Sequence, residues 1–189
     1  MKYTLNEAIV VDRPIEDCFA YLKDFSTIEQ WDPGVYRSRK LTPGSPAVGT
    51  EYEILLKLPG NKQAAMHYRQ IAIEPPRQLI LEGIGDNFSA LDTITFTALD
   101  GNRTSIDYRA ELDLAWLKPS VAWVFKPLLK RIGTKAVNGM RLAFSNPDSP
   151  AERRLKNDIC DNLATPAALG FGKRGYLSMS RKSHTNRMD

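Results

Sequence analysis

Between residues 35 and 114, hydrophobic and polar residues alternate with a period of two, and short turn sequences interrupt the alternation. This period is typical of strands that bury one face and expose the other to water. The predicted strands cover 35–42, 49–58, 63–74, 78–85, 88–99 and 103–114. An Asp-Gly pair, Asp100-Gly101, lies between the last two strands, and such a pair between alternating runs is a strong hairpin signal.

The chain before this region predicts one further strand and two short helices. Residues 2–11 suit a strand that ends at Asp12-Arg13-Pro14, and Pro14 fits the first turn of a helix. A second short helix is expected from Asp24 to Trp31, capped near Ser26 and ended by Asp32-Pro33-Gly34. The first helix carries apolar residues at helical spacing, namely Ile15, Cys18, Phe19 and Leu22.

After Pro119 the pattern changes to a long amphipathic helix. Pro127 should kink this helix or mark its start, because proline cannot donate a backbone hydrogen bond. The prolines at 147 and 150 end it, so we expect a folded domain over 1–146 and an extension over 147–189 that is part helical and part loose. The predicted inward stripe comprises Val121, Val124, Phe125, Leu128, Ile132, Ala136, Met140 and Ala143.

This order of elements predicts an α+β fold. A curved antiparallel sheet of seven strands would wrap around one long C-terminal helix, with two short helices after the first strand. One helix cannot fill the concave side of so long a sheet. The remaining space is expected to form an apolar cavity, which is the usual form of a small-molecule site.

Composition and charge narrow the class of protein. The 189 residues carry a net charge of +4, but residues 1–150 hold 18 basic and 18 acidic residues, so the excess belongs to residues 151–189. A neutral body argues against nucleic-acid binding. Two distant cysteines and two isolated histidines give no metal site or disulfide framework. We expect a cytoplasmic protein without a signal peptide, membrane span, metal or cofactor.

Several sequence pieces, in this order and spacing, resemble the START/Bet v 1-like (SRPBCC) superfamily, in particular its polyketide cyclase/dehydrase and lipid-transport branch. The resemblance covers roughly residues 2–145 and implies the helix-grip fold. It implies a cavity for a hydrophobic small molecule or lipid more firmly than it implies catalysis, because only some members do chemistry there. The pieces are residues 11–22, Trp31-Asp32-Pro33-Gly34-Val35, Val48-Gly49-Thr50-Glu51-Tyr52, Glu74-Pro75-Pro76-Arg77-Gln78-Leu79, Asp92-Thr93-Ile94-Thr95-Phe96 and residues 103–114.

The strand pattern points four polar side chains into this cavity. Asp92 shares the parity of Ile94 and Phe96, and Tyr52, Tyr68 and Tyr108 lie on apolar faces. An inward carboxyl needs a partner or a raised pKa, and it could hold a ligand hydroxyl or act as a general acid or base. The alternative is that these groups are core residues satisfied by their neighbours. His67 is expected to face solvent and Cys18 to lie in the core.

The remaining cavity candidates are apolar or aromatic. Trp31 either contacts ligand at the cavity rim or packs its helix on the sheet. The segment 116–126 is aromatic and flanked by lysines, so it would cap the cavity or contact a membrane surface weakly. The full set of predicted cavity residues is Trp31, Tyr52, Tyr68, Asp92, Ile94, Phe96, Tyr108, Trp123 and Met140.

Three functions follow from these observations. The first is a binding module for a hydrophobic small molecule or lipid, acting as carrier, sensor or accessory. The second is a polyketide cyclase/dehydratase-like enzyme in which Asp92 and a cavity tyrosine act as acid and base. The third is a membrane-docking accessory protein, whose residues 168–176 resemble the linker that precedes a short-chain dehydrogenase in fusion proteins.

Overall fold

The computed structural model describes residues 1–58, 62–114 and 122–145 of the chain. Seven antiparallel strands form one sheet in the order β1-β7-β6-β5-β4-β3-β2, which confirms the predicted α+β helix-grip architecture. The strands are β1 (Lys2–Val11), β2 (Val35–Lys40), β3 (Glu51–Leu58), β4 (Lys62–Glu74), β5 (Gln78–Gly85), β6 (Phe88–Leu99) and β7 (Arg103–Leu114). Strand boundaries agree with the alternating pattern to within two residues at each end.

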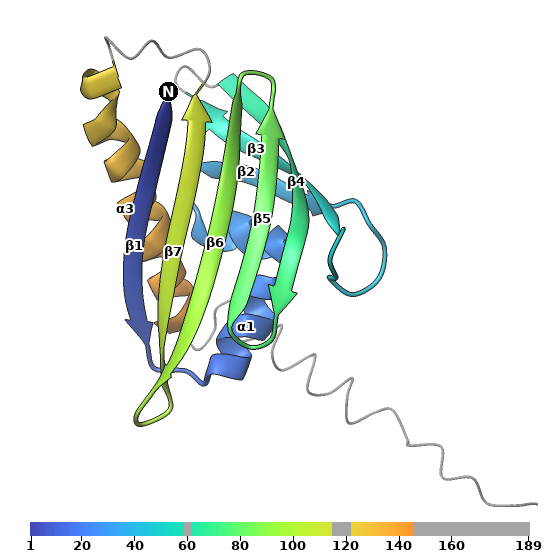
Figure 1. Cartoon of the computed structure of the whole chain (residues 1–189), viewed down its shortest axis with the longest axis vertical. Helices are drawn as coiled ribbons and strands as arrows, with labels where there is room; N and C mark the ends of the chain where they lie inside the picture. Colours follow the sequence, from blue (N-terminus) through green and yellow to red (C-terminus); the bar gives the residue numbers. More distant parts are fainter. Residues whose placement is uncertain (59–61, 115–121, 146–189) are drawn as a thin grey trace, which may run out of the picture.

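The helices lie on one side of the sheet (Figure 1). They are α1 (Ile15–Lys23), a 3-10 turn η1 (Phe25–Thr27), α2 (Ile28–Trp31) and α3 (Ala122–Ser145). The long helix α3 packs against β1 and α2, so it closes the edge of the sheet that β1 forms. The hydrophobic core lies between this helical layer and the inner face of the sheet.

The β6–β7 hairpin shows why the Asp-Gly signal was informative. Leu99 is paired with Arg103, so three residues connect the two strands, and two of them, Gly101 and Asn102, have a positive φ of 70° and 64°. Glycine and asparagine tolerate this backbone conformation, which allows the tight reversal. Asp92 is thereby paired with Ala110, and Ile94 with Tyr108. The hairpin thus sets which side chains of the two strands share the inner face.

Two local predictions are corrected. The helical turn after α1 is capped by Asp24, whose carboxylate accepts from the Ser26 backbone N–H at 3.1 Å, rather than by Ser26. Pro14 precedes the first helical turn as its N-cap. Of the two positions predicted for Pro127, inside the long helix or at its start, the structure has the residue inside α3.

The predicted inward stripe of α3 can be followed from Leu128 onward, because the side chains of Val121, Val124 and Phe125 lie outside the described residues. Ala136, Met140 and Ala143 are buried, but Leu128 and Ile132 are 50% and 48% exposed. Ile132 borders a cavity, whereas Leu128 is not among the residues that line it. Within the described residues, no helix has the length and apolar character needed to cross a membrane.

Candidate functional site

A cavity of about 220 Å³ lies between the inner face of the sheet and the helical layer. Its walls come from β1, β3, β4, β6 and β7 on one side and from α2 and α3 on the other. Most of the lining is apolar, and its polar side chains are two aspartates and three tyrosines. The described residues that line it are Tyr3, Leu5, Ile28, Asp32, Ile54, Leu56, Met66, Tyr68, Phe88, Ala90, Asp92, Tyr108, Ala110, Leu112, Leu114, Leu129, Ile132, Gly133 and Ala136.

Asp92 is the central polar group of this cavity. Strand β6 points it inward, as its parity with Ile94 predicted, and it is only 2% exposed. The hydroxyls of Tyr68 and Tyr108 both donate hydrogen bonds to its carboxylate. Two charge-assisted hydrogen bonds explain how a carboxylate is tolerated between Leu81 and Ala110, its neighbours on the adjacent strands.

Tyr68 reaches Asp92 across a whole strand, and a glycine makes this possible. Tyr68 on β4 is paired with Gly83 on β5, and Gly83 is paired with Ala90 on β6. A Cβ on Gly83 would lie 2.5 Å from the Cζ atom of the Tyr68 ring. The ring therefore lies over Gly83, and its hydroxyl extends toward β6. Tyr108 needs no such path, because it lies diagonally opposite Asp92 on the neighbouring strand.

Burial dominates the electrostatics of the three groups. Burial raises the pKa of Asp92 to about 6, the hydrogen bonds from Tyr68 and Tyr108 act in the opposite direction, and the charge of Asp32 adds to the rise. The pKa values of Tyr68 and Tyr108 lie well above their usual value of 10, because of burial and the nearby carboxylate. Both phenols therefore keep their protons, while Asp92 changes its charge close to neutral pH.

A second carboxyl, that of Asp32, lines the same cavity. It directly follows α2, and its Oδ1 accepts a hydrogen bond from the Gly34 backbone N–H at 2.7 Å. Burial raises its pKa, while this hydrogen bond and the charge of Lys57 lower it. In the sequence, Asp32 is part of a predicted helix stop and of a piece that carries the family resemblance, and neither feature predicted a cavity residue. A turn residue has no strand parity, so no periodic signal placed it in the cavity.

The predicted cavity residues separate into two groups. Tyr68, Asp92 and Tyr108 line the cavity, whereas the other described candidates pack in the surrounding core. The side chain of Trp123 lies outside the described residues, as do the segment 116–121 and the extension 147–189. The buried candidates outside the lining are Trp31, Tyr52, Ile94, Phe96 and Met140.

Trp31 is buried beside the site rather than at its rim. Its ring meets the edge of the Tyr108 ring at a centroid distance of 6.2 Å and that of Phe25 at 6.4 Å. Its Nε1 has no hydrogen-bond partner among the described residues. Two roles were predicted for Trp31, ligand contact and packing. The contact between its ring and the Tyr108 ring favours packing, because it restrains the position of Tyr108. Cys18 is buried in the core and His67 is exposed, as the pattern predicted.

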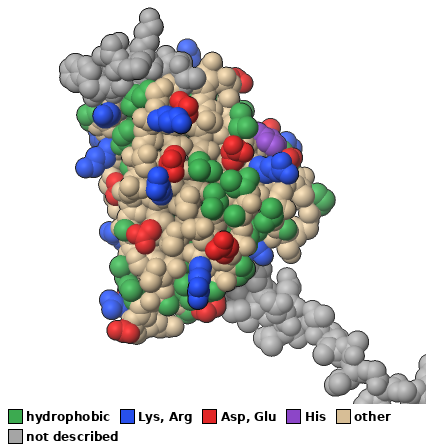
Figure 2. All heavy atoms as spheres, viewed as in Figure 1, with side chains coloured by type: hydrophobic (Ala, Val, Ile, Leu, Met, Phe, Trp, Pro, Cys, Tyr) green, Lys and Arg blue, Asp and Glu red, His purple; other side chains and the backbone are tan. Residues whose placement is uncertain are grey.

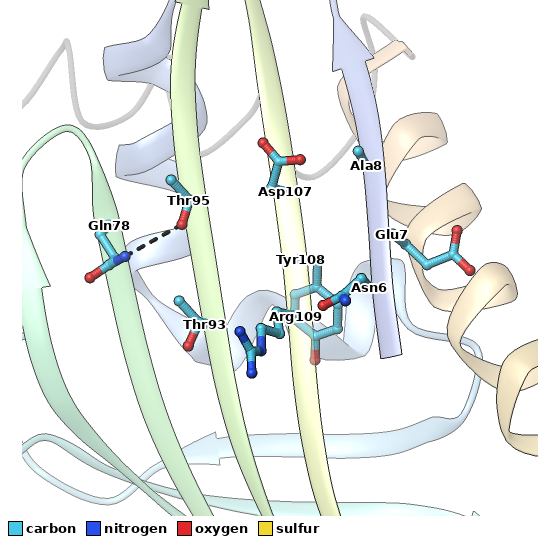
Figure 3. Close-up of a pocket in the computed structure, with 9 residues that line it drawn as sticks. All are labelled: Asn6, Glu7, Ala8, Gln78, Thr93, Thr95, Asp107, Tyr108 and Arg109. Atoms are coloured by element: carbon cyan, nitrogen blue, oxygen red, sulfur yellow. Dashed lines mark hydrogen bonds between the residues drawn. The ribbon is translucent and has the colours of Figure 1, made fainter. Parts of the chain in front are cut away.

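A second hollow lies on the outer face of the sheet and has a volume of about 450 Å³. Figure 2 shows this outer face, on which acidic and basic side chains are interspersed with small hydrophobic groups. In Figure 3, Thr93, Thr95 and Arg109 extend from the outer face, whereas the Tyr108 ring lies behind β7. Gln78 donates to the Thr95 hydroxyl at 3.4 Å. The lining residues are Asn6, Glu7, Ala8, Gln78, Thr93, Thr95, Asp107, Tyr108 and Arg109.

Solved structures share this architecture at low sequence identity. The aromatase/cyclase ZhuI from Streptomyces sp. R1128 is 15% identical, with a TM-score of 0.63 over 82% of this chain and 96% of that one. A START superfamily protein from Mycobacterium smegmatis is 13% identical, with a TM-score of 0.57 over 84% of this chain and 98% of that one. The di-domain aromatase/cyclase StfQ of the steffimycin pathway is 13% identical, with a TM-score of 0.58 over 82% and 52%.

These likenesses establish the fold, and a family model adds a match in sequence. No curated protein matches the chain. The model described as polyketide cyclase / dehydrase and lipid transport matches residues 2–143, which include every strand, both short helices and most of α3. The chain therefore belongs to the polyketide cyclase/dehydrase and lipid-transport family, and it shares its fold with an aromatase/cyclase and a START superfamily protein.

Proposed function

We propose that the protein binds a hydrophobic small molecule or lipid in the inner cavity, with Asp92 and its two tyrosines as the polar anchor. The observation that carries this proposal is a carboxylate held by Tyr68 and Tyr108 at the wall of an otherwise apolar cavity. A core that needed only stability would gain little from such a group, because burying a charge costs more than burying an apolar side chain. An oriented polar group in an apolar pocket is the usual basis of ligand orientation.

The first experiment is native mass spectrometry of the gently purified full chain, followed by solvent extraction. We expect a discrete bound molecule whose occupancy falls in Asp92→Asn. Glu82→Gln is the matched control, since it also removes one carboxylate but lies exposed on the outer face of the adjacent strand. Equal occupancy in the two variants would remove Asp92 from the site. An empty protein that also fails to bind two-ring hydrophobic probes would contradict the proposal.

A second candidate function, acid/base catalysis of the cyclase/dehydratase type, is favoured by the pKa of about 6 for Asp92. A carboxylate with this pKa is ionised at pH 7 and is a stronger base than an ordinary aspartate. With a β-hydroxyketone in the cavity, Asp92 would take the proton between the carbonyl and the hydroxyl-bearing carbon. The carbon–oxygen bond then breaks, and the departing hydroxide receives that proton and leaves as water.

A suitable substrate analogue is 3-hydroxy-1-tetralone, which gives fluorescent 1-naphthol after loss of water and tautomerisation. We expect a rate above the buffer background that rises with pH through about 6, because the ionised carboxylate is the base. Asp92→Asn should lose at least about a hundredfold in rate. A rate equal to background in the wild-type protein would exclude this chemistry for the analogue and would leave the binding role intact.

A further inference from the structure

The hydrogen-bond donors at the Asp92 end of the cavity are already used. A tyrosine hydroxyl has one proton, and Tyr68 and Tyr108 both give theirs to Asp92. An ionised carboxylate has no proton and about four acceptor positions, of which the two tyrosines use two. Both phenols stay protonated, so their oxygens also have only acceptor capacity left. This end of the cavity therefore offers acceptors and no free donor.

The charges of the lining have the same bias. Two carboxyl side chains, Asp32 and Asp92, line the cavity, and its described lining contains no lysine, arginine or histidine. Lys57 acts on Asp32 but lies outside this lining, and its Nζ donates to the Pro33 carbonyl at 2.9 Å on the exposed side. A negative ligand group inside the cavity would meet like charges in a poorly hydrated space, where repulsion is weakly screened.

One other hydroxyl in the lining is not committed to Asp92. Tyr3 on β1 is paired with Leu112, four residues along β7 from Tyr108. Its position separates it from the Asp92 cluster. The buried Nε1 of Trp31 is a donor with no partner in the part of the chain that the structure describes, but Trp31 is not among the described lining residues. Neither group supplies a positive charge to the Asp92 end.

We propose that the cavity selects ligands whose polar end donates hydrogen bonds, such as an alcohol, a phenol or an amine, and rejects ligands that end in a carboxylate, a phosphate or an isolated ketone. This inference rests on the proposed binding function and adds the chemical class of the ligand. A donor completes the acceptor positions of Asp92, whereas an acceptor at the same place leaves both partners unsatisfied. An amine gains further from the two carboxyl groups.

The test is isothermal titration of the full chain at pH 7.5 with four probes that share one naphthalene body. They are 2-naphthylmethanol, 2-naphthylmethylamine, 2-acetonaphthone and 2-naphthoate. The two rings suit a cavity of about 220 Å³. We expect the alcohol and the amine to bind at least about tenfold more tightly than the ketone and the carboxylate, which is the effect of one satisfied hydrogen bond to a charged group.

Three variants assign this preference to its causes. Asp92→Asn supplies an amide donor, so the gap between alcohol and ketone should narrow to about threefold or less. Asp32→Asn should reduce the advantage of the amine over the alcohol and leave the ketone unaffected. Glu82→Gln on the outer face should keep the wild-type order. Circular dichroism and thermal unfolding of each variant show that it is folded before it is titrated.

The outcomes separate this inference from the function on which it rests. If the ketone or the carboxylate binds the wild-type protein as tightly as the alcohol, the head-group preference is wrong and the binding role stands. The same conclusion follows if Asp92→Asn keeps the full wild-type gap. If none of the four probes binds a protein that native mass spectrometry shows to be empty, the proposed binding function fails, and the preference fails with it.

Discussion

Two hollows lie on opposite sides of the same strands, and they differ in chemistry more than in size. The outer one, about 450 Å³, is larger than the inner cavity of about 220 Å³. On β6, Thr93 and Thr95 face the outer hollow while Asp92 faces the inner one. On β7, Arg109 faces outward and the Tyr108 ring inward. Adjacent residues of one strand therefore supply two very different surfaces.

The difference lies in access to water. Arg109 and Glu111 on the outer face form an ion pair at 3.0 Å, but their side chains are 55% and 43% exposed, so water competes with the pair. The carboxylate of Asp92 has no such access and depends on Tyr68 and Tyr108. A polar group that water could stabilise says little about function. One that requires two dedicated partners in an apolar cavity indicates a site.

The largest expected effect concerns Asp92 and pH. Its pKa is raised in the folded state from 3.8 to about 6, so between these values the folded state binds more protons than the unfolded chain. Stability contributed by protonated Asp92 is therefore lost as the pH rises through this window. We expect Asp92→Asn to gain about 3 kcal/mol relative to wild type between pH 3.5 and pH 7, measured by urea unfolding at several pH values.

The comparison of two proteins at each pH removes the contribution of every other titrating group. A stability difference that stays constant from pH 3.5 to pH 7 would show that Asp92 is not a buried carboxyl with a raised pKa. In that case the contrast between the inner and outer hollows would lose its electrostatic basis. Near-UV circular dichroism of Asp92→Asn verifies that its aromatic core is packed as in wild type.

Gly83→Ala has the next largest effect, because it disturbs the inner cavity from within the sheet. Alanine suits a strand slightly better than glycine, so backbone preference alone predicts a small gain in stability. The added Cβ would instead lie 2.5 Å from the Tyr68 ring. We expect a loss of about 2 kcal/mol in urea unfolding, together with weaker binding of 2-naphthylmethanol, since Tyr68 can no longer lie over this position.

The adjacent residue provides the matched control for this variant. Glu82 is exposed on the outer face, so Glu82→Ala should change stability by no more than about 0.5 kcal/mol and leave probe binding intact. A stable Gly83→Ala protein with normal probe affinity would mean that the Tyr68 hydroxyl reaches Asp92 without the space over Gly83. An equal loss of stability in Gly83→Ala and Glu82→Ala would mean that any substitution in β5 destabilises the protein.

The sequence predicted the fold and part of the site for the same physical reason, namely periodicity. A period of two assigns each strand residue to a face, so Asp92, Tyr68 and Tyr108 could all be placed inside. Their meeting could not be predicted, because it depends on the register of four strands, β4 to β7, and on the open space above Gly83. Hydrophobic alternation indicates a face and does not indicate which residues of distant strands touch.

Residues without a period were missed or misplaced. Asp32 lies in a turn, and its position in the cavity follows from how α2 packs on the sheet. Leu128 and Ile132 fit an apolar helical stripe, yet they are about half exposed. A helical stripe indicates the face a helix can bury. How much of that face is covered depends on the length and curvature of the partner sheet.

The smallest expected effect tests the outer hollow directly. Arg109→Gln removes a positive charge that lines the larger hollow and breaks the exposed ion pair with Glu111. We expect a change in stability within about 0.5 kcal/mol and a change in 2-naphthylmethanol affinity below about twofold. The physical reason is that Arg109 is not among the groups that act on Asp92, although the residue next to it, Tyr108, donates to that carboxylate. If Arg109→Gln lowered the affinity for 2-naphthylmethanol as much as Asp92→Asn does, the ligand would bind in the outer hollow. The larger volume of that hollow, and not the buried carboxylate of the inner cavity, would then identify the binding site.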